Sequence, residues 1–272
     1  MYLLFFLLCL WPHQTNKAYV EVLGIDIGSY GIKGAIVDTE KGEIVSRKKT
    51  TDKIDDTRPH KLISKLHKVV KKFEWDGPIG CAFPAATSRG IVLSTTRMDQ
   101  GWVDADADHL FTEITGCNVS VINDTDAVGL AEMKFGVGKG QRGTVIVLTV
   151  GTGIGSSLFI DGTLVPNTEL GQIEIKGISI EERASNRVRK EEGIRKKTWG
   201  KRLQLVFEQY ERLFHPDLFI LGGQLSKKAD KTFPYIKIKT KFKAASLLNN
   251  ASIVGAAYYA ASVQMKNKEF YR

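Results

Sequence analysis

Cysteine is scarce in this chain. The 272 residues include three cysteines, which stand far apart in the sequence as Cys9, Cys81 and Cys117. An odd number of scattered thiols excludes a disulfide framework, and no pair has the spacing of a cysteine-rich zinc site. We therefore expect a reduced, intracellular protein that resides in the cytoplasm.

Long apolar runs are also lacking. The most apolar stretch is MYLLFFLLCLWP at the start of the chain. Its run of about 10 apolar residues is too short to span a bilayer, which takes about 20. No Lys or Arg precedes the run and no clear small-residue cleavage site follows it, so a secretory signal is disfavoured. We expect residues 1–20 to lie outside the fold, as a weak anchor or an upstream start, and we expect no stable membrane span.

Acidic residues are fewer than basic ones. Lys and Arg number 39 against 30 for Asp and Glu, which gives a net charge of +9 and a pI of about 9.3. This balance indicates a polyanionic partner such as nucleic acid, an acidic membrane or a long phosphate chain. A solvated basic surface is an equal alternative. The remaining composition, 43% hydrophobic and 25% charged, is typical of a globular protein with one large domain or two smaller ones.

Periodic apolar segments predict an α/β fold in which one pattern occurs twice. In the first half we expect strands at residues 22–27, 31–37, 43–49, 78–83 and 119–122, and helices at 58–73 and 127–135. In the second half we expect strands at residues 144–149, 156–160 and 218–221, and helices at 199–214 and 253–263. The repetition predicts two domains around a central cleft, a small one from residues 21–122 plus 252–265 and a large one from residues 123–251.

Two glycine-rich hairpins have the composition of phosphate-binding loops. The first runs from Asp26 to Lys33 (DIGSYGIK) and the second from Leu148 to Gly155 (LTVGTGIG). Glycines let the chain turn sharply, so that backbone N–H groups can face a phosphate with no side chain between them. Asp26, at a strand end, can hold a magnesium ion through water, because this ion keeps several of its waters. One such hairpin is more often an ordinary turn, but two of them are less often a coincidence.

Two further segments follow strands. Leu221-Gly222-Gly223 permits the close approach of a flat ligand such as a nucleotide base, and it can equally be a plain strand-to-helix turn. Asn123-Asp124 ends a strand and opens a helix, where a helix N-cap is the default interpretation. The functional alternative is that both side chains face the cleft and that Asp124 accepts the proton of a sugar hydroxyl during attack on phosphorus.

These four elements, in this order, resemble the actin-like ATPase (ribonuclease H-like) sugar-kinase fold. Within that fold the chain is similar to the ROK family and its polyphosphate-using glucokinases, over about residues 23–261. The similarity is closest at residues 123–132 (NDTDAVGLAE), 148–156 (LTVGTGIGS), 162–171 (GTLVPNTELG), 181–185 (EERAS), 216–223 (PDLFILGG) and 226–230 (SKKAD). It implies transfer of a phosphoryl group from polyphosphate, ATP or both to a hexose, with glucose to glucose 6-phosphate as the expected reaction and Mg²⁺ as the cofactor.

The resemblance also implies roles for individual residues. Asp124 would be the catalytic base and Asn123 a partner of a sugar hydroxyl, with Glu169 and Glu181 as further hexose ligands. The phosphate and nucleotide site would comprise Asp26, Gly28, Ser29, Gly31, Lys33, Gly151, Thr152, Gly153, Gly155, Gly222 and Gly223. Many ROK proteins hold structural zinc with a cysteine cluster that this sequence lacks, and no DNA-binding helix-turn-helix precedes Leu23. We therefore expect no zinc and no nucleic-acid partner.

Three residues depart from the family pattern, and all three fall around the expected sugar pocket. Where the family usually has His, Gly and Asn, this chain has Gln172, Ala85 and Arg97. Phosphoryl transfer is therefore better supported than glucose specificity. A kinase for mannose or fructose and a non-catalytic sugar sensor remain as alternatives, although a sensor has no need of Asp124.

Basic residues recur in the second half of the chain. They lie between Arg183 and Arg202, at Lys227, Lys228 and Lys231, and at Lys237, Lys239, Lys241 and Lys243. A lysine is a point charge that tolerates many phosphate positions, so these segments can form a track for a polyphosphate chain. Helix faces in water are an equal alternative. Donor preference stays open, and so does a homodimer, which is frequent among related proteins.

Overall fold

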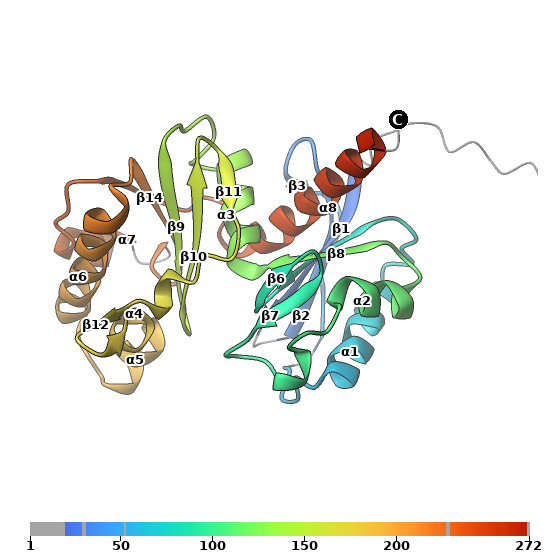
Figure 1. Ribbon diagram of the computed structural model, residues 1–272, viewed down its shortest axis with the longest axis horizontal. Helices are drawn as coiled ribbons and strands as arrows, with labels where there is room; N and C mark the ends of the chain where they lie inside the picture. Colours follow the sequence, from blue (N-terminus) through green and yellow to red (C-terminus); the bar gives the residue numbers. More distant parts are fainter. Residues whose placement is uncertain (1–19, 29–30, 52, 227–228, 271–272) are drawn as a thin grey trace, which may run out of the picture.

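Two mixed β-sheets form the framework of the molecule and lie side by side (Figure 1). The computed structural model describes residues 20–28, 31–51, 53–226 and 229–270. The expected α/β fold is confirmed. No helix within these ranges is both long enough and apolar enough to cross a membrane.

The first sheet has the strand order β3-β2-β1-β5-β8. Its strands are β1 (Glu21–Gly28), β2 (Gly31–Asp38), β3 (Glu43–Ile44), β5 (Ile79–Phe83) and β8 (Val119–Asn123), with the short β4 (Lys49–Thr50) paired to β2. β2 is antiparallel to β1, whereas β1, β5 and β8 are parallel. Parallel strands end at the same edge of a sheet, so the ends of β1 and β8 bring Asp26 and Asn123 to one edge.

Alternating residues of the first sheet pack against helices on opposite faces. The helices are α1 (Pro59–Lys71), α2 (Ala107–Thr115) and α8 (Ala251–Phe270). Leu23 of β1 packs in one core cluster with Leu62 of α1 and Phe111 of α2. Its neighbour Val22 packs in another cluster with Ile253 of α8. Because successive side chains of a strand point to opposite faces, α1 and α2 cover one face and α8 covers the other.

The second sheet has the order β11-β10-β9-β14-β15. Its strands are β9 (Thr144–Val150), β10 (Ile154–Ile160), β11 (Thr163–Val165), β14 (Leu218–Gly223) and β15 (Lys241–Ala244), and the helices on its faces are α3 (Asp124–Lys134) and α6 (Lys196–Phe214). Leu148 of β9 packs in one cluster with Trp199 and Phe207 of α6. Val147 packs in another with Met133 of α3.

Short elements fill the space around the sheets. They are the hairpin β6 (Ala86–Ser88) and β7 (Ile91–Ser94), the hairpin β12 (Glu174–Ile175) and β13 (Ile178–Ser179), the helices α4 (Ile180–Ala184), α5 (Asn186–Glu191) and α7 (Ala229–Thr232), and 3-10 turns that include η2 (Leu170–Gln172). None of these elements was expected from the sequence, because each is too short to show a periodic pattern.

Several expected elements differ from the structure in their bounds. The helices expected at residues 199–214 and 253–263 are longer, as α6 (Lys196–Phe214) and α8 (Ala251–Phe270). The strand expected at residues 43–49 is reduced to β3 and β4, because the Ser46 hydroxyl accepts the Ile36 N–H at 2.8 Å and interrupts the ladder. The helix expected at residues 127–135 begins earlier, at Asp124, because Asn123 caps it. The division of the chain into two domains at the expected boundaries stays a prediction.

Candidate active site

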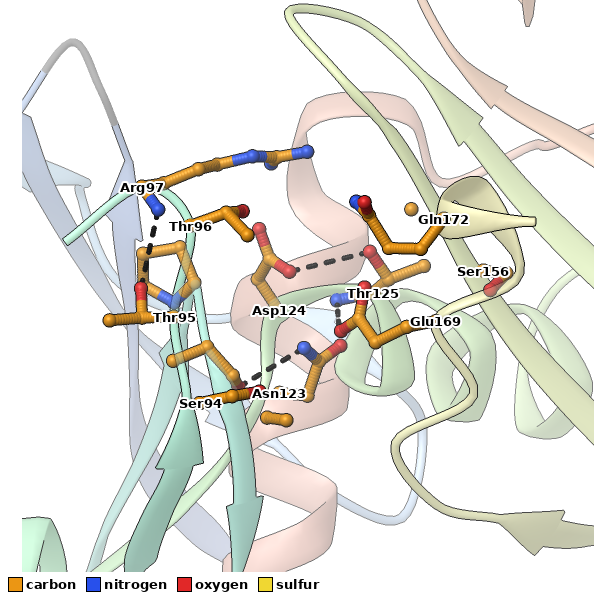
Figure 2. Close-up of a pocket in the computed structure, with 14 residues that line it drawn as sticks. Ser94, Thr95, Thr96, Arg97, Asn123, Asp124, Thr125, Ser156, Glu169 and Gln172 are labelled. Carbon is orange, nitrogen blue, oxygen red and sulfur yellow. Dashed lines mark hydrogen bonds between the residues drawn. The ribbon is translucent and has the colours of Figure 1, made fainter. Parts of the chain in front are cut away.

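A cavity of about 200 Å³ lies where the end of β8, the β6–β7 hairpin and the η2 segment meet (Figure 2). Its lining residues are Pro84, Ala85, Ala86, Ser94, Thr95, Thr96, Arg97, Asn123, Asp124, Thr125, Gly155, Ser156, Glu169 and Gln172. We call it the acceptor pocket. It brings together six of the seven residues assigned to the base and the hexose, which are Ala85, Arg97, Asn123, Asp124, Glu169 and Gln172. The seventh, Glu181, contacts the pocket through Arg97.

The junction of β8 and α3 fixes the orientation of Asp124. Asn123 is the helix N-cap, and its Oδ1 accepts the N–H groups of Thr125 at 2.9 Å and Asp126 at 3.1 Å. Its Nδ2 donates to the Ala85 carbonyl at 3.1 Å. Asn123 is therefore both a cap and part of the pocket wall, and one N–H of its amide is left for a ligand. The two interpretations of Asn123-Asp124 are thus compatible.

Asp124 is the first residue of α3, and its carboxylate faces the pocket (Figure 2). Burial raises the pKa of this carboxyl, while the Arg97 charge and hydrogen bonds from Thr125 lower it in part. The Thr125 hydroxyl donates to Asp124 Oδ1 at 3.3 Å. A desolvated carboxylate is a stronger base than one in water, and nearby positive charge favours its ionised form, so Asp124 is suited to proton abstraction.

Arg97 and Glu181 connect the acceptor pocket to the second glycine loop. Arg97 Nη2 pairs with Glu181 Oε2 at 3.1 Å, and the same oxygen accepts the Ile154 N–H at 2.8 Å. A Cβ atom at Gly153 would overlap both the guanidinium and the carboxylate. Glycine at this position therefore permits the loop to lie directly against the ion pair.

Glu169 and Gln172 enter the pocket from the second sheet. The η2 turn that carries them is fixed by the Ser156 hydroxyl, which accepts the Leu170 N–H at 2.9 Å, and by Tyr210, whose hydroxyl donates to the Leu170 carbonyl at 3.0 Å. Desolvation raises the pKa of Glu169, and the Asp124 charge adds to this effect. Gln172 is exposed at the pocket opening, in keeping with contact to a bound molecule.

A second cavity, of about 410 Å³, adjoins the other side of the Gly151–Gly155 loop. Its lining residues are Gly151, Thr152, Asn186, Arg187, Lys190, Glu191, Gly223, Gln224 and Asn249. We call it the donor pocket. The N–H groups of Asn186 and Arg187 donate to the Gly151 carbonyl at 3.0 and 3.3 Å, which holds α5 against the loop. The second and third sequence motifs therefore meet in one pocket, through Gly151, Thr152 and Gly223.

The first hairpin places Asp26 opposite Lys33 in the β1–β2 register. Burial raises the pKa of Asp26 to about 6, the Lys33 charge opposes this shift, and the Asp124 charge adds to it. Gly28 and Gly31 pair at the end of the hairpin, and Gly31 has a φ of 121°. Ser29, between them, lies outside the described residues.

The carboxylates near Asp124 are the described groups that could bind magnesium. Within the described ranges, no three His, Cys, Asp or Glu side chains form a group that could enclose a metal ion. Asp26 and Asp124 nevertheless interact with each other as like charges. Mg²⁺ in phosphoryl-transfer sites is bound by one or two carboxylates, donor phosphates and waters rather than by a protein cage. The donor chemistry of the two carboxylates is of the kind that such a site uses.

The sequence did not single out several residues of the donor pocket. Asn186 begins α5, which directly follows the EERAS segment, so that segment was the available signal. Arg187 and Lys190 of the same helix fall within the basic stretch expected between Arg183 and Arg202. Asn249 belongs to the short 3-10 turn η5 (Leu248–Asn250), which carries no motif.

The basic track is divided among different roles. Arg187 and Lys190 line the donor pocket. Arg202 pairs with Glu192 at 2.6 Å, and Arg189 lies over the Trp199 ring. Lys227 and Lys228 lie outside the described residues, and the track as a whole stays a prediction.

Comparison with known proteins agrees with the motifs. The chain is 40% identical over 235 residues to a polyphosphate glucokinase of Mycobacterium tuberculosis (strain CDC 1551 / Oshkosh), a match that covers 86% of this chain and 89% of the relative. It is 38% identical to the polyphosphate glucokinase of Mycobacterium leprae (strain TN), over 86% of this chain and 72% of the relative.

Among solved structures, the inorganic polyphosphate/ATP-glucomannokinase from Arthrobacter sp. strain KM is similar, with a TM-score of 0.86 and 40% identity over 90% of this chain and 99% of that one. Residues 22–175 match the ROK family itself, as the motifs predicted. The chain belongs to the ROK family.

Proposed function

We propose that this chain transfers a phosphoryl group from polyphosphate or ATP to a hexose, with glucose to glucose 6-phosphate as the main reaction. The observation that carries the proposal is the position of the Gly151–Gly155 loop between two cavities. Gly151 and Thr152 line the donor pocket, and Gly155 lines the acceptor pocket with Asp124. A phosphate chain seated in the first cavity therefore presents its end to a hydroxyl group in the second. The names of the relatives at 38–40% identity support the same chemistry.

Asp124 is proposed as the general base. It would orient the attacking hydroxyl group of the sugar, expected to be the 6-hydroxyl, and accept its proton as the oxygen attacks phosphorus. The raised pKa of its carboxyl favours this role, and Arg97 keeps the group ionised by its charge. Asn123, Glu169 and Glu181 are proposed to hold the other hydroxyl groups, and the N–H groups of the glycine loop to hold the phosphates.

Asp26, with Asp124 beside it, is proposed to hold Mg²⁺ through water molecules. When bound, the ion offsets negative charge on the donor phosphates. Lys33, which lies across the hairpin from Asp26, adds positive charge on the same side. No zinc is proposed.

Arg187 and Lys190 are proposed to bind a polyphosphate donor beyond its terminal phosphates. Gly222 and Gly223, at the end of β14, are proposed to adjoin the base of ATP. Both donors would share the glycine loop. We further propose a cytoplasmic location, in keeping with the free thiols of Cys81 and Cys117, and leave a homodimer as a prediction.

Mannose is a second candidate acceptor, because a solved structure at 40% identity is described as a glucomannokinase. Ala85, Arg97 and Gln172 all lie in the acceptor pocket, so a change of sugar preference would arise there. Fructose has no such support.

One assay grid tests the proposal. Purified protein is combined with ATP or ATP-free polyphosphate and with glucose, mannose or fructose, and sugar phosphate is quantified. The Asp124→Asn variant, purified in parallel, controls for contaminating kinases. We expect glucose 6-phosphate from the wild-type protein and a loss of about 10²–10⁴-fold in the variant. Sugar binding without turnover, under every donor, would instead identify a sugar sensor.

A further inference from the structure

Asn167 has an unusual backbone conformation close to the acceptor pocket. It lies between β11 and η2, and its φ is 58°, in the left-handed region that residues other than glycine adopt rarely. Asn tolerates this region better than most residues, because its short amide can hydrogen-bond locally. Here, however, the amide bonds to a segment 80 positions away in the sequence.

The Asn167 side chain pairs with the backbone of Thr87 through two hydrogen bonds. Its Oδ1 accepts the Thr87 N–H at 2.8 Å, and its Nδ2 donates to the Thr87 carbonyl at 2.7 Å. The two bonds involve both ends of one amide, so they fix orientation as well as distance. Thr87 belongs to β6, beside the first sheet, whereas Asn167 follows β11 of the second sheet (Figure 1).

The Asn167 backbone makes a third contact, with the helix that carries the proposed base. Its N–H donates to Asp126 Oδ2 at 2.8 Å. Asp126 is 1% exposed, and its other carboxyl oxygen has no partner among the described residues. Burial raises the pKa of Asp126 to about 7, against the opposing effect of the Asn167 bond. The Asp126 carboxyl is therefore buried at a desolvation cost, which its hydrogen bond from the Asn167 N–H offsets in part.

The segments that contain Thr87, Asn167 and Asp126 each contribute a lining residue to the acceptor pocket. In each segment this lining residue is at most two positions away from the residue that makes the contact. Ala86 directly precedes Thr87, Glu169 follows Asn167 by two residues, and Asp124 precedes Asp126 by two. Asn167 therefore links the β6 wall of the pocket to the Glu169 wall.

We propose that Asn167 is a positioning residue that holds the two walls of the acceptor pocket at the spacing a hexose requires. The inference rests on the proposed function. Without the Thr87 pairing, the walls would be joined less firmly and the sugar would have to order them on binding, which weakens affinity. The donor pocket, which lies on the other side of the glycine loop, should be unaffected.

The test is Asn167→Gly. Glycine keeps the left-handed backbone and the N–H bond to Asp126, and it removes only the two Thr87 bonds. We expect the glucose Kd from titration calorimetry and the glucose KM to rise about tenfold, which is ~1.4 kcal/mol. The donor KM should stay within about twofold. Lys176→Gly is the matched control, because Lys176 is exposed, has a φ of 53° in the β12–β13 turn and should show no change in either constant.

If Asn167→Gly does not fold, Asn167→Asp is used as the test variant instead. It has the same shape and tolerance for the left-handed region, but it sets a carboxylate oxygen against the Thr87 carbonyl, so the glucose KM should rise as well. An unchanged glucose Kd in a folded variant would overturn the inference. So would equal increases in the sugar and donor KM, which indicate general loosening. If the wild-type protein neither binds nor phosphorylates any hexose, the proposed function is wrong, and this inference falls with it.

Discussion

Replacing Asp124 with Asn distinguishes two roles of this residue, that of a catalytic base and that of a carboxylate that only stabilises the start of a helix. The amide has nearly the same shape, and its Oδ1 can accept the Thr125 hydroxyl as Asp124 does at 3.3 Å. The cap itself belongs to Asn123 and is untouched. The main loss is therefore the ability to accept a proton. Removing a positioned general base lowers kcat by about 10²–10⁴-fold, or about 3–5 kcal/mol in the barrier.

Whereas Asp124→Asn lowers kcat, it should leave the stability of the fold unchanged or raise it. Burial raises the pKa of Asp124, so the fold disfavours its charged form at neutral pH. The neutral amide removes this cost. It also gives up a favourable charge at the start of α3, which is worth about 0.3–1 kcal/mol. Since burial is the largest effect on this carboxyl, we expect a Tm that is unchanged or higher.

The measurement is kcat at saturating glucose and donor, with Tm and glucose Kd determined on the same preparations. Asp106→Asn is the matched control, because Asp106 caps α2 by accepting the His109 N–H at 2.9 Å and does not line the acceptor pocket. It should leave kcat unchanged. A variant of Asp124 that keeps more than a tenth of the wild-type kcat, or one whose activity falls only in step with Tm, would show that the carboxylate merely stabilises the helix.

Four further changes test other parts of the molecule. Arg97→Gln removes a charge that lowers the pKa of both Asp124 and Glu169, so the acid limb of the pH profile of kcat/KM should move to higher pH; an unmoved limb would exclude Arg97 as their partner. Gln172→His should change kcat/KM for glucose by less than about tenfold (~1.4 kcal/mol). A gain for glucose with a loss for mannose would indicate a mannose pocket, and no effect on any sugar would show that the Gln172 side chain does not contact the bound sugar. Gly255→Ala would set a Cβ against a backbone carbonyl of α3 and should lower the free energy of unfolding by about 1–3 kcal/mol in a urea titration, a result that an unchanged midpoint would contradict. Rising salt should increase the KM of polyphosphate more than that of ATP, because exposed charges are screened over about 8–10 Å, and equal responses would argue against the basic track.

The sequence identified those parts of the site in which the residues lie next to each other, at the end of a strand and in the turn that follows it. The end of β8 gave Asn123 and Asp124, and the turn after β9 gave Gly151 and Thr152. Both signals are short and follow buried strands, and the parallel strands of each sheet bring such ends to a common edge. The periodic pattern placed the helix from residue 127 onward, because the acidic first turn of α3 has no apolar periodicity, whereas the cap signal of Asn123-Asp124 indicated its observed start.

The contacts that join the two sheets could not be predicted in the same way. Arg97 and Glu181 are 84 positions apart, and Asn167 and Thr87 are 80 apart. Neither pair has a local pattern, because the bonds depend on how the two sheets are packed. Arg97 was noticed only as a departure from the family, which gave its place in the pocket but not its partner. Asn186 of α5 was missed because a six-residue helix shows no periodicity, whereas Arg187 and Lys190 were expected only as members of the basic track.

The cluster of carboxylates around the acceptor pocket explains why the site should weaken the fold that carries it. Asp26 and Asp126 have pKa values raised to about 6 and about 7, from an ordinary value of 3.8. A carboxyl group with a raised pKa binds its proton more tightly in the folded state than in the unfolded chain. Stability is therefore highest below pH 4 with respect to these groups, and it is lost as the pH rises through the interval from about 4 to about 7. At neutral pH the empty protein holds desolvated carboxylates near Asp124, and Lys33 opposes the raised pKa of Asp26 while Arg97 opposes that of Asp124. The same burial that makes these charges costly for the fold raises the pKa of Asp124 and so makes it basic enough to take a proton from a sugar.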